Sequence, residues 1–511
     1  MIEAAVTSYD DVPYDSKPLY STHPDCLATA ARLRGLPAAS SRSCRVLELG
    51  CATGGNLIPM AYTLPGSRFV GVDLSASQID RAKDQAQRLG LANIDLHAAS
   101  IAAIDASWGS FDFVICHGVF SWVPPEIQDH ILWICRELLT PHGVAYVSYN
   151  TYPGWHLRSV VRDLMRFHAA RFDDPQTKVQ QARSILAFMA ESSTGLAGTL
   201  AQVLASEAEL LKDAPDYYVF HEHLEEANQP LYFHQFIGKA RAAGLAYLGE
   251  AWHHTQFDNF EPQVQETLQA LSTDLIEMEQ FADYLTGRTF RRTLLCHAEA
   301  PVCHTPDPTV LDQLYLTALA QPASDQPAVA SSASASFRLD DGTVASTNIP
   351  IMKAALVELY RQWPAAVPFQ GLVASAVRDA EIVPESQATT PAVLAALLVR
   401  GYLSHLVAIH SEPFQFARKV SDRPRASGVA RMLAAERSLV PNLRHRLVGI
   451  SPTERLVLQA ADGTRSLDEI AGEVAPHLVT ARPESAPHDS QDRQQVQDAL
   501  HRLARCALFE A

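Results

Sequence analysis

The chain has 511 residues, of which 47% are hydrophobic and 19% are charged, and its formal net charge is −16. This length allows about three domains, and the composition is that of a globular protein with a hydrophobic core of ordinary size. The acidic balance argues against nucleic acid as the partner, because binding to a phosphate backbone rests largely on Lys and Arg.

The N-terminus and the cysteines indicate a cytoplasmic protein. Residues 1–16 contain no basic segment followed by an apolar run, so we expect no secretory signal. No stretch of about 18 uninterrupted apolar residues occurs, so we expect no membrane insertion. The eight cysteines have no framework spacing, and three of them fall inside apolar patterns, as is typical of buried thiols in a reducing compartment.

Residues 45–150 alternate short apolar runs with amphipathic stretches. This rhythm of strand, helix and strand is typical of crossover units and predicts a largely parallel sheet in an α/β fold. Strands are predicted at 45–49, 69–72, 94–97, 111–116 and 144–149. Helices are predicted at 56–64, 75–89 and 125–139.

The same sheet is expected to resume later in the chain, which makes it a seven-stranded Rossmann-like sheet with helical insertions. After a helix at 231–243, two apolar runs predict the sixth and seventh strands at 245–250 and 293–297. The segments at about 156–215 and 252–290 are then helical insertions. Insertions that follow the C-terminal ends of strands lie over the ligand crevice of an open α/β sheet, where they can select the substrate.

A stretch rich in Pro, Ala and Ser at 322–336 predicts a linker before a C-terminal, helix-rich region. Its order of helices and short strands is typical of winged-helix modules, and the acidic charge favours packing over DNA binding. The expected organisation is a lid over the cofactor site (1–44), a Rossmann-like core (45–155), a helical insertion (156–230), the end of the sheet with a second insertion (231–300), a linker (301–336) and a winged-helix-like region (337–511).

A glycine-rich turn follows the first predicted strand, in the run Val46-Leu-Glu-Leu-Gly-Cys-Ala-Thr-Gly-Gly-Asn56. Residues without side chains let the backbone approach a ligand closely, and the next helix presents free amide groups. Asp73 ends the second strand, where a carboxylate can accept both hydroxyls of an adenosine ribose. These two features on adjacent strands predict a site for a nucleoside cofactor.

The motif resembles that of class I S-adenosylmethionine (SAM)-dependent methyltransferases. A dinucleotide fingerprint would need Gly at position 52, which is Ala, whereas Glu48 matches the acidic position of the methyltransferase motif. Ser100 stands where the family usually places an Asp against the adenine amino group, and the run ending at His117 is typical of its fourth strand. The resemblance implies SAM as cofactor, bound by Glu48, Gly50, Cys51, Ala52, Gly54, Asn56, Asp73, Leu74, Ser100, Ile101 and His117.

Segments beyond the core resemble a narrower family, the bacterial methyltransferases that carry a methyltransferase regulatory domain. These segments are Tyr9–Tyr14, Thr22–Pro24, Asn150–Trp155, Tyr217–Phe233 and Arg288–His297. The best-understood relatives are protein-lysine methyltransferases of rickettsial type. The resemblance therefore implies a lysine side chain of a protein as the methyl acceptor.

Methyl transfer requires alignment of acceptor, methyl and sulfur, and a lysine acceptor must first lose a proton. A poorly hydrated aromatic pocket lowers the pKa of an amine. We expect Tyr152, His117 and Trp155 to be the catalytic residues, with Tyr152 held in a Pro-Gly turn after the fifth strand. Other aromatic candidates, for which ordinary packing is the alternative, are Tyr14, Trp122 and Tyr149.

Two further interpretations stay open at this point: a small-molecule N- or O-methyltransferase, and a non-catalytic SAM-binding regulator. The place after the fourth strand holds neither the tetrad of nucleobase amino-methyltransferases nor a Pro-Cys nucleophile. We expect no metal, since His221 and His223 lack a matching ligand pair at zinc-like spacing. The large helical additions predict a macromolecular acceptor and a homodimer.

Overall fold

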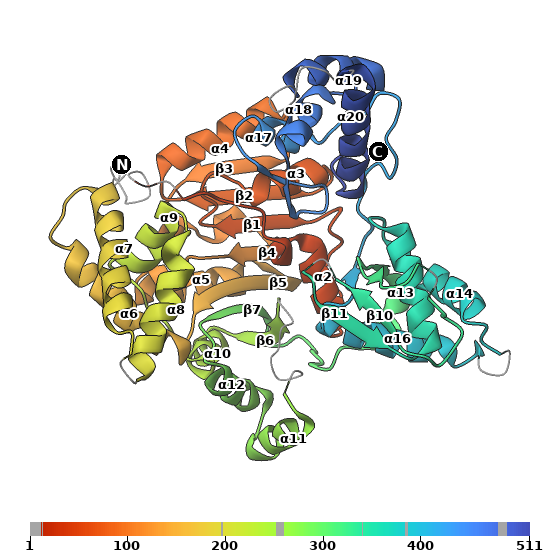
Figure 1. Cartoon of the computed structure of the whole chain (residues 1–511). Coiled ribbons are helices and arrows are strands. Elements are labelled where there is room, and N and C mark those ends of the chain that lie inside the picture. Colours follow the sequence, from red (N-terminus) through yellow and green to blue (C-terminus); the bar gives the residue numbers. More distant parts are fainter. Residues whose placement is uncertain are drawn as a thin grey trace.

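The fold is built on one seven-stranded sheet with helices on both faces and two further units at one side (Figure 1). The structure is a computed structural model, and it describes residues 12, 14–195, 198–251, 260–325, 327–339, 341–383, 387–478 and 488–511.

The strand order of the sheet is β3-β2-β1-β4-β5-β7-β6, as Figure 1 shows. The strands are β1 (Arg45–Leu49), β2 (Arg68–Asp73), β3 (Ile94–Ala98), β4 (Phe111–Cys116), β5 (Leu139–Asn150), β6 (Leu245–Glu250) and β7 (Phe290–His297). The pairs among β1 to β5 are parallel, while β7 runs antiparallel to both β5 and β6. The predicted seven-stranded α/β sheet is confirmed.

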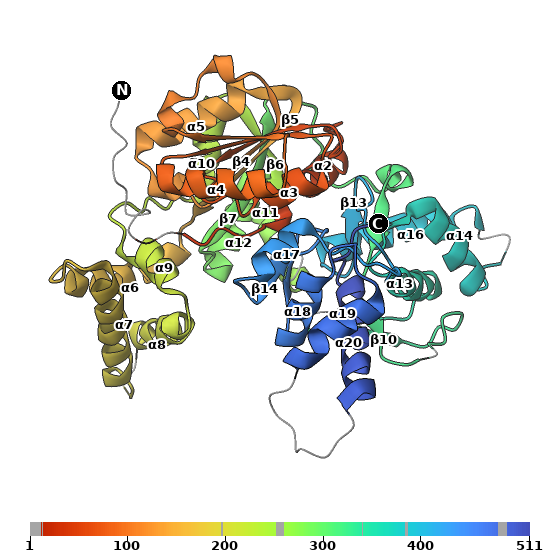
Figure 2. The same cartoon turned by 90° about the horizontal axis from the view of Figure 1, so that it is seen from above.

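Helices cover both faces of this sheet, which explains why its strands are continuous apolar runs rather than alternating ones. Figure 2 shows the strands between α5 on one side and α2, α3 and α4 on the other. The covering helices are α2 (Pro24–Arg32), α3 (Leu57–Thr63), α4 (Ala76–Arg88), α5 (Pro125–Glu137) and α10 (Phe233–Ala242). Ser75 caps α4 by accepting from the backbone N–H of Gln78.

Two helical insertions extend from the sheet. The first contains α6 (Gly154–Ala169), α7 (Pro175–Ser192), α8 (Thr199–Lys212), α9 (Asp216–Val219) and the π-helical turn η5 (Phe220–Leu224). It has its own small core around Val161, Met165 and Leu186, and it projects to one side in Figures 1 and 2. The second insertion contains α11 (Pro262–Leu271) and α12 (Leu275–Thr286).

Residues 301–336, for which composition predicts a linker, contain η7 (Pro308–Gln313), β8 (Tyr315–Thr317), β9 (Gln321–Pro322) and the start of β10 (Ala335–Arg338). Strand β10 pairs with β9 and β11 (Val344–Thr347), and β8 lies between β12 (Val367–Pro368) and β13 (Ala408–His410). Leu311, Leu314 and Leu316 are buried in one core with α13 (Pro350–Gln362), α14 (Phe369–Asp379) and α16 (Thr390–Leu403). The Pro/Ala/Ser stretch is held against α13 by Lys353, whose Nζ donates to the carbonyl oxygens of Ala328, Ser331 and Ala333.

The C-terminal unit combines α17 (Gly428–Ala434), a hairpin of β14 (Leu439–Pro441) and β15 (Leu447–Gly449), α18 (Pro452–Ala460), α19 (Leu467–Val474) and α20 (His488–Arg505). It packs against the α3 side of the sheet, where the N–H of Gly428 donates to the Tyr62 hydroxyl at 2.9 Å (Figure 2). In the described part of the chain, no helix is both long and apolar enough to cross a membrane.

Candidate cofactor and acceptor site

The turn after β1 has a left-handed backbone at three positions, with φ of 75° at Gly50, 47° at Ala52 and 73° at Gly54. A Cβ on Gly50 would lie 2.4 Å from Cγ2 of Val119, and one on Gly54 would lie 2.8 Å from Cδ1 of Ile58. Both glycines are therefore needed for backbone conformation and for space. The N–H groups of Gly50 and Cys51 both donate to the Val72 carbonyl oxygen, at 2.8 and 3.1 Å, which fixes this turn, here called the cradle, at the carboxyl end of the sheet.

Asp73 joins the ends of β1 and β2. Its Oδ2 accepts from the N–H of Ala52 and its Oδ1 from the N–H of Ser75, both at 2.9 Å. The neighbouring Leu74 is 52% exposed, which leaves an apolar surface beside the carboxylate. At the end of β3, Ser100 caps the short turn η2 (Ile101–Ala103) by accepting from Ala102 N–H. The structure thus brings the predicted residues of three strand ends together.

Glu48 is a buried carboxylate, only 4% exposed, beneath this cradle. Its Oε1 accepts from Asn56 Nδ2 at 2.7 Å, and its Oε2 has no hydrogen-bond partner among the described residues. Burial raises the pKa of Glu48 to about 7, the hydrogen bond from Asn56 opposes this rise, and the charge of Asp73 adds to it. A buried acceptor with an unused oxygen suits a cationic group such as the ammonium of SAM.

Asn56 connects the cradle to two distant parts of the chain. Its Oδ1 accepts from the N–H of Leu19 at 2.9 Å and lies 2.8 Å from Nε2 of His445. A Cβ on Gly55 would lie 2.1 Å from the carbonyl oxygen of Ser16, so the N-terminal segment crosses directly over the turn. Of the Tyr9–Tyr14 motif, residues 9–11 and 13 lie outside the described residues. The Asn56 side chain holds the lid and the C-terminal unit rather than facing the cradle.

Cys51 contributes only its backbone to the cradle. It is 2% exposed, and its Sγ would lie 2.8 Å from a Cβ on Gly71 in the neighbouring strand. Burial raises the pKa of its thiol well above the ordinary value. The side chain therefore packs against the sheet and does not contact a ligand.

His117 follows β4, and its Nδ1 lies 3.0 Å from the Tyr146 hydroxyl and 3.1 Å from Ser148 Oγ. Burial, and then the charge of Arg292, lower the pKa of His117 to about 3, so the ring is neutral at physiological pH. Tyr146, Ser148 and Arg292 were not predicted as site residues from the sequence. The alternation of Tyr146 and Ser148 on one face of β5 was the signal that could have found the first two.

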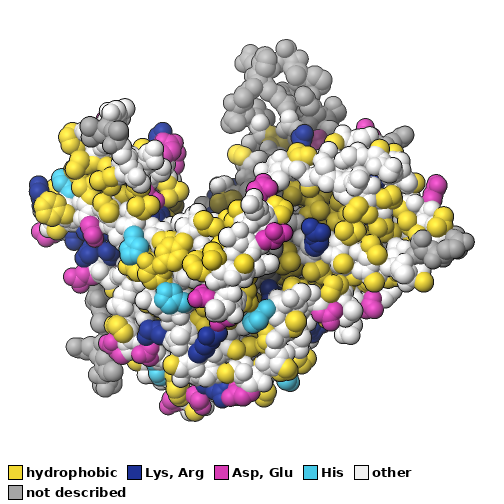
Figure 3. Space-filling model, turned by 90° about the horizontal axis from the view of Figure 1, so that it is seen from below, with side chains coloured by type: hydrophobic (Ala, Val, Ile, Leu, Met, Phe, Trp, Pro, Cys, Tyr) yellow, Lys and Arg dark blue, Asp and Glu magenta, His cyan; other side chains and the backbone are white. Residues whose placement is uncertain are grey.

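Tyr152 lies in the short connection between β5 and α6. Its ring stacks on His156 with centroids 3.9 Å apart and lies 5.3 Å from the ring of Tyr232. The Tyr232 hydroxyl in turn lies 3.0 Å from His156 Nε2, and Tyr284 on α12 is 50% exposed beside it. Figure 3 shows hydrophobic side chains and histidines gathered on the face seen from below. Tyr152 thus belongs to a partly exposed aromatic cluster, one strand away from His117.

Trp155 is 1% exposed, and its ring packs against Trp122 and the Arg158 guanidinium. This burial does not fit the expected catalytic contact, because a substrate cannot reach the ring. Tyr149 is also buried and stacks on Phe236 at 4.0 Å, on the face of the sheet away from His117. Both large rings fill the core beneath the strand ends.

The His221-to-Glu226 segment forms structural contacts in the turn η5. His221 Nδ1 lies 3.0 Å from Glu225 Oε1, and its Nε2 lies 2.7 Å from the carbonyl oxygen of Val12. The ring of Tyr14 lies 6.2 Å from that of His221, so this turn holds the N-terminal segment in place. Across the described ranges, no group of three or more His, Cys, Asp or Glu side chains is arranged to hold a metal ion.

The sequence matches three protein families. Residues 46–143 match the methyltransferase domain, residues 215–297 match the predicted methyltransferase regulatory domain, and residues 422–510 match the "PKMT, C-terminal winged helix domain". An uncharacterised protein of Rickettsia prowazekii is 34% identical over 480 residues, which cover 92% of this chain and 86% of that protein.

Two solved structures resemble the whole chain. PKMT2 from Rickettsia typhi is 31% identical, with a TM-score of 0.87 over 97% of this chain and 100% of that one. PKMT2 in complex with AdoHcy is 30% identical, with a TM-score of 0.86 and the same coverage. The similarity therefore includes the sheet, the insertions and the C-terminal units.

Proposed function

Because the chain belongs to the family of SAM-dependent methyltransferases that includes PKMT2 of Rickettsia typhi, we propose that it methylates lysine side chains of proteins. The observation that carries this proposal is the match over nearly the whole chain, including a winged-helix domain named after PKMT (protein lysine methyltransferase). A small-molecule acceptor would not account for the shared insertions and C-terminal units.

The cofactor would lie along the ends of β1 to β4. Asp73 would accept from the ribose hydroxyls, Leu74 and Ile101 would flank the adenine, and Ser100 would face its amino group. The turn from Gly50 to Gly54 would lie against the methionine portion, and Glu48 would accept from its ammonium. When bound, SAM supplies an electrophilic methyl group on a sulfonium.

The residues around His117 favour a neutral amine. A lysine has a reference pKa of about 10.4, and both burial and a nearby positive charge lower it. Burial and the charge of Arg292 lower the pKa of His117 to about 3, and the same environment would lower the pKa of an incoming ammonium. Since Tyr146 and Ser148 engage Nδ1, the Nε2 atom of the neutral ring is the one that can meet the amine.

The affinity for SAM should depend on pH through Glu48. Its pKa is about 7 in the free protein, and a cationic ligand binds the ionised form more tightly. We expect the affinity ratio of wild type to Glu48→Gln to rise about tenfold between about pH 6 and pH 8 and then to level off. Titration calorimetry at several pH values measures this ratio. A ratio that does not change with pH would contradict the assignment.

Tyr152 should act on turnover and not on cofactor affinity, because its stacked ring lies beyond the strand end and outside the cradle. We expect Tyr152→Phe to lower kcat about ten- to a hundredfold at unchanged SAM affinity, if the hydroxyl positions the amine. Tyr360→Phe, a half-buried tyrosine of α13, is the control and should keep wild-type kcat. Wild-type kcat in both Tyr152→Phe and Tyr152→Ala would remove Tyr152 from the site.

The acceptor is identified with tritiated SAM and fractionated lysate, followed by gel electrophoresis and mass spectrometry. We expect label in protein bands and methylated lysine in their peptides. Label that appears solely in the small-molecule fraction would show that the methyl acceptor is a metabolite and not a protein. No label in any fraction, from protein that binds SAM, would favour the non-catalytic regulator.

We also infer that the chain forms a homodimer. Large apolar side chains are exposed on α6 to α8, which supports it: Leu157, Val160, Phe167, Phe188, Leu200 and Leu210. Equilibrium sedimentation at micromolar concentration should give twice the chain mass of 55.9 kDa, and a monomer would contradict the dimer.

A further inference from the structure

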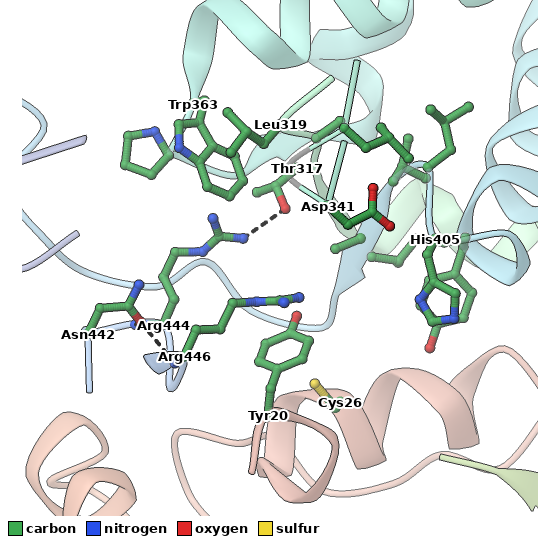
Figure 4. A pocket seen from close by; sticks show the side chains of 18 of the residues that line it. Tyr20, Cys26, Thr317, Leu319, Asp341, Trp363, His405, Asn442, Arg444 and Arg446 are labelled. Atoms are coloured by element: carbon green, nitrogen blue, oxygen red, sulfur yellow. Dashed lines mark hydrogen bonds between the residues drawn. The ribbon is translucent and has the colours of Figure 1, made fainter. Parts of the chain in front are cut away.

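A cavity of about 420 Å³ lies where three parts of the chain meet, away from the cofactor cradle. Tyr20 and Cys26 line it from the N-terminal segment and α2, Thr317 and Trp363 from the middle unit, and Arg444 from the C-terminal unit (Figure 4). None of the predicted cofactor residues lines it. Its volume falls within the roughly 300–1,000 Å³ of small-molecule sites.

Two guanidinium groups, of Arg444 and Arg446, point side by side into this cavity from the turn between β14 and β15 (Figure 4). The residue between them, His445, points the opposite way, toward Asn56 of the cofactor cradle. Arg444 lies 4.2 Å from the centroid of the Trp363 ring, and Arg446 lies 3.9 Å from that of Tyr20. Aromatic faces therefore hold both groups in place.

Much of the donor capacity of these two arginines is unused. Arg444 is 2% exposed, and its Nη2 donates to Thr317 Oγ1 at 2.9 Å. Its Nε and Nη1 have no hydrogen-bond partner within the described ranges, and neither has Nε of Arg446. These donors are buried, so water does not satisfy them at the protein surface.

The charge of the two arginines is also unbalanced. Among the described residues, no carboxylate lies within ion-pair distance of either one. The nearby Asp25 is engaged by His410 and by the backbone and hydroxyl of Ser411. Asp341 lies on the exposed rim and accepts from Thr343 N–H. Burial lowers the pKa of Arg444 to about 10, and the charge of Arg446 adds to this shift while Tyr20 and Asp25 oppose it.

We propose that this cavity binds a small molecule through an oxyanion group, a phosphate or a carboxylate, held between Arg444 and Arg446. Guanidinium groups match two oxygens of such a group through charge-assisted hydrogen bonds, and the anion would balance the buried positive charge. Trp363 and Leu319 form an apolar wall beside the arginines that would contact the rest of the ligand. None of the proposed cofactor-binding residues lines this cavity, and the proposal does not depend on the identity of the methyl acceptor.

The test uses the full chain and two probes, inorganic phosphate and citrate, in thermal unfolding and titration calorimetry. We expect at least one probe to raise the unfolding temperature saturably, whereas potassium chloride at the same ionic strength does not. The probe that binds more tightly identifies the phosphate or the carboxylate as the recognised group. A wild-type protein that responds to neither probe at millimolar concentration would overturn the proposal.

Substitution separates this cavity from other anion sites. We expect Arg444→Met to weaken probe binding at least about tenfold. In the absence of probe, this variant should unfold at the same temperature as wild type or a higher one, because the substitution removes an unpaired buried charge. Arg361→Met, at an exposed arginine paired with Asp379, should leave the response unchanged. If Arg444→Met does not fold, the Arg446→Met variant is tested in its place, and loss of its thermal response to the probe supports the site. A wild-type response in a folded Arg444→Met or Arg446→Met variant overturns it.

Discussion

Replacing Asp73 by alanine is expected to weaken SAM binding about a hundredfold, or about 3 kcal/mol. The carboxylate would lose its two proposed hydrogen bonds to the ribose hydroxyls, and bonds to a charged acceptor each contribute roughly 1.5–3 kcal/mol at most. The variant also loses the acceptors for the N–H groups of Ala52 and Ser75, which hold the cradle in its binding conformation. Titration calorimetry with SAM measures the effect.

Asp112→Ala is a matched control for this experiment. Asp112 likewise accepts from a backbone N–H, that of Arg45 at 2.8 Å, and from a side chain, that of Thr140 at 3.1 Å. It lies at the opposite end of the sheet, near the start of β4, so its removal should leave SAM affinity near wild type. If Asp73→Ala binds SAM with unchanged affinity, Asp73 does not bind the ribose and the proposed placement of the cofactor is wrong.

Replacing Arg291 by methionine is expected to lower the free energy of unfolding by roughly 3–5 kcal/mol. Arg291 is completely buried, and it contacts Asp283 at 2.8 Å and both Glu250 and Glu279 at 3.0 Å. The substitution leaves three carboxylates with Arg288 as the remaining cation of the cluster. Since these acids belong to β6 and α12, the end of the sheet and the second insertion should loosen together.

Urea unfolding measures this loss, and Arg241→Met provides the control. Arg241 is exposed and lies 4.0 Å from Asp274, so its replacement should change the free energy of unfolding by about 0.5 kcal/mol or less. A loss below about 1 kcal/mol in Arg291→Met would mean that the cluster relaxes or takes up protons at little cost.

The sheet was predictable because its information is local. A strand covered on both faces must be apolar throughout, and an amphipathic stretch between two such strands must cross over. The strands from β1 to β4 therefore begin and end within about a residue or two of their predicted bounds. The cradle was equally readable, since only glycine combines a positive φ at Gly50 and Gly54 with the contacts of Val119 and Ile58.

The segment expected as a linker is irregular only in its second half. The Pro/Ala/Ser stretch at 322–336 enters strands only at its two ends, β9 and β10, whereas η7 and β8 precede it and pack with the middle unit through Leu311, Leu314 and Leu316. Backbone pairing depends little on side-chain composition, so a window of sequence does not report it. Trp155 shows the same limit of a local sequence pattern. A tryptophan at that position is compatible both with lining a substrate pocket and with packing in the interior, and the structure shows it buried.

The sequence by itself determined the α/β sheet, the cofactor cradle and, through its resemblance, the methyltransferase family. The tertiary structure alone decided that His445 meets Asn56, 389 residues earlier in the chain, and that Arg444 and Arg446 share a cavity with Tyr20. It also decided that Arg291 lies among three acids. Strands and glycine turns follow from the chemistry of adjacent residues, whereas these contacts depend on how separately folded units pack, which no local pattern encodes.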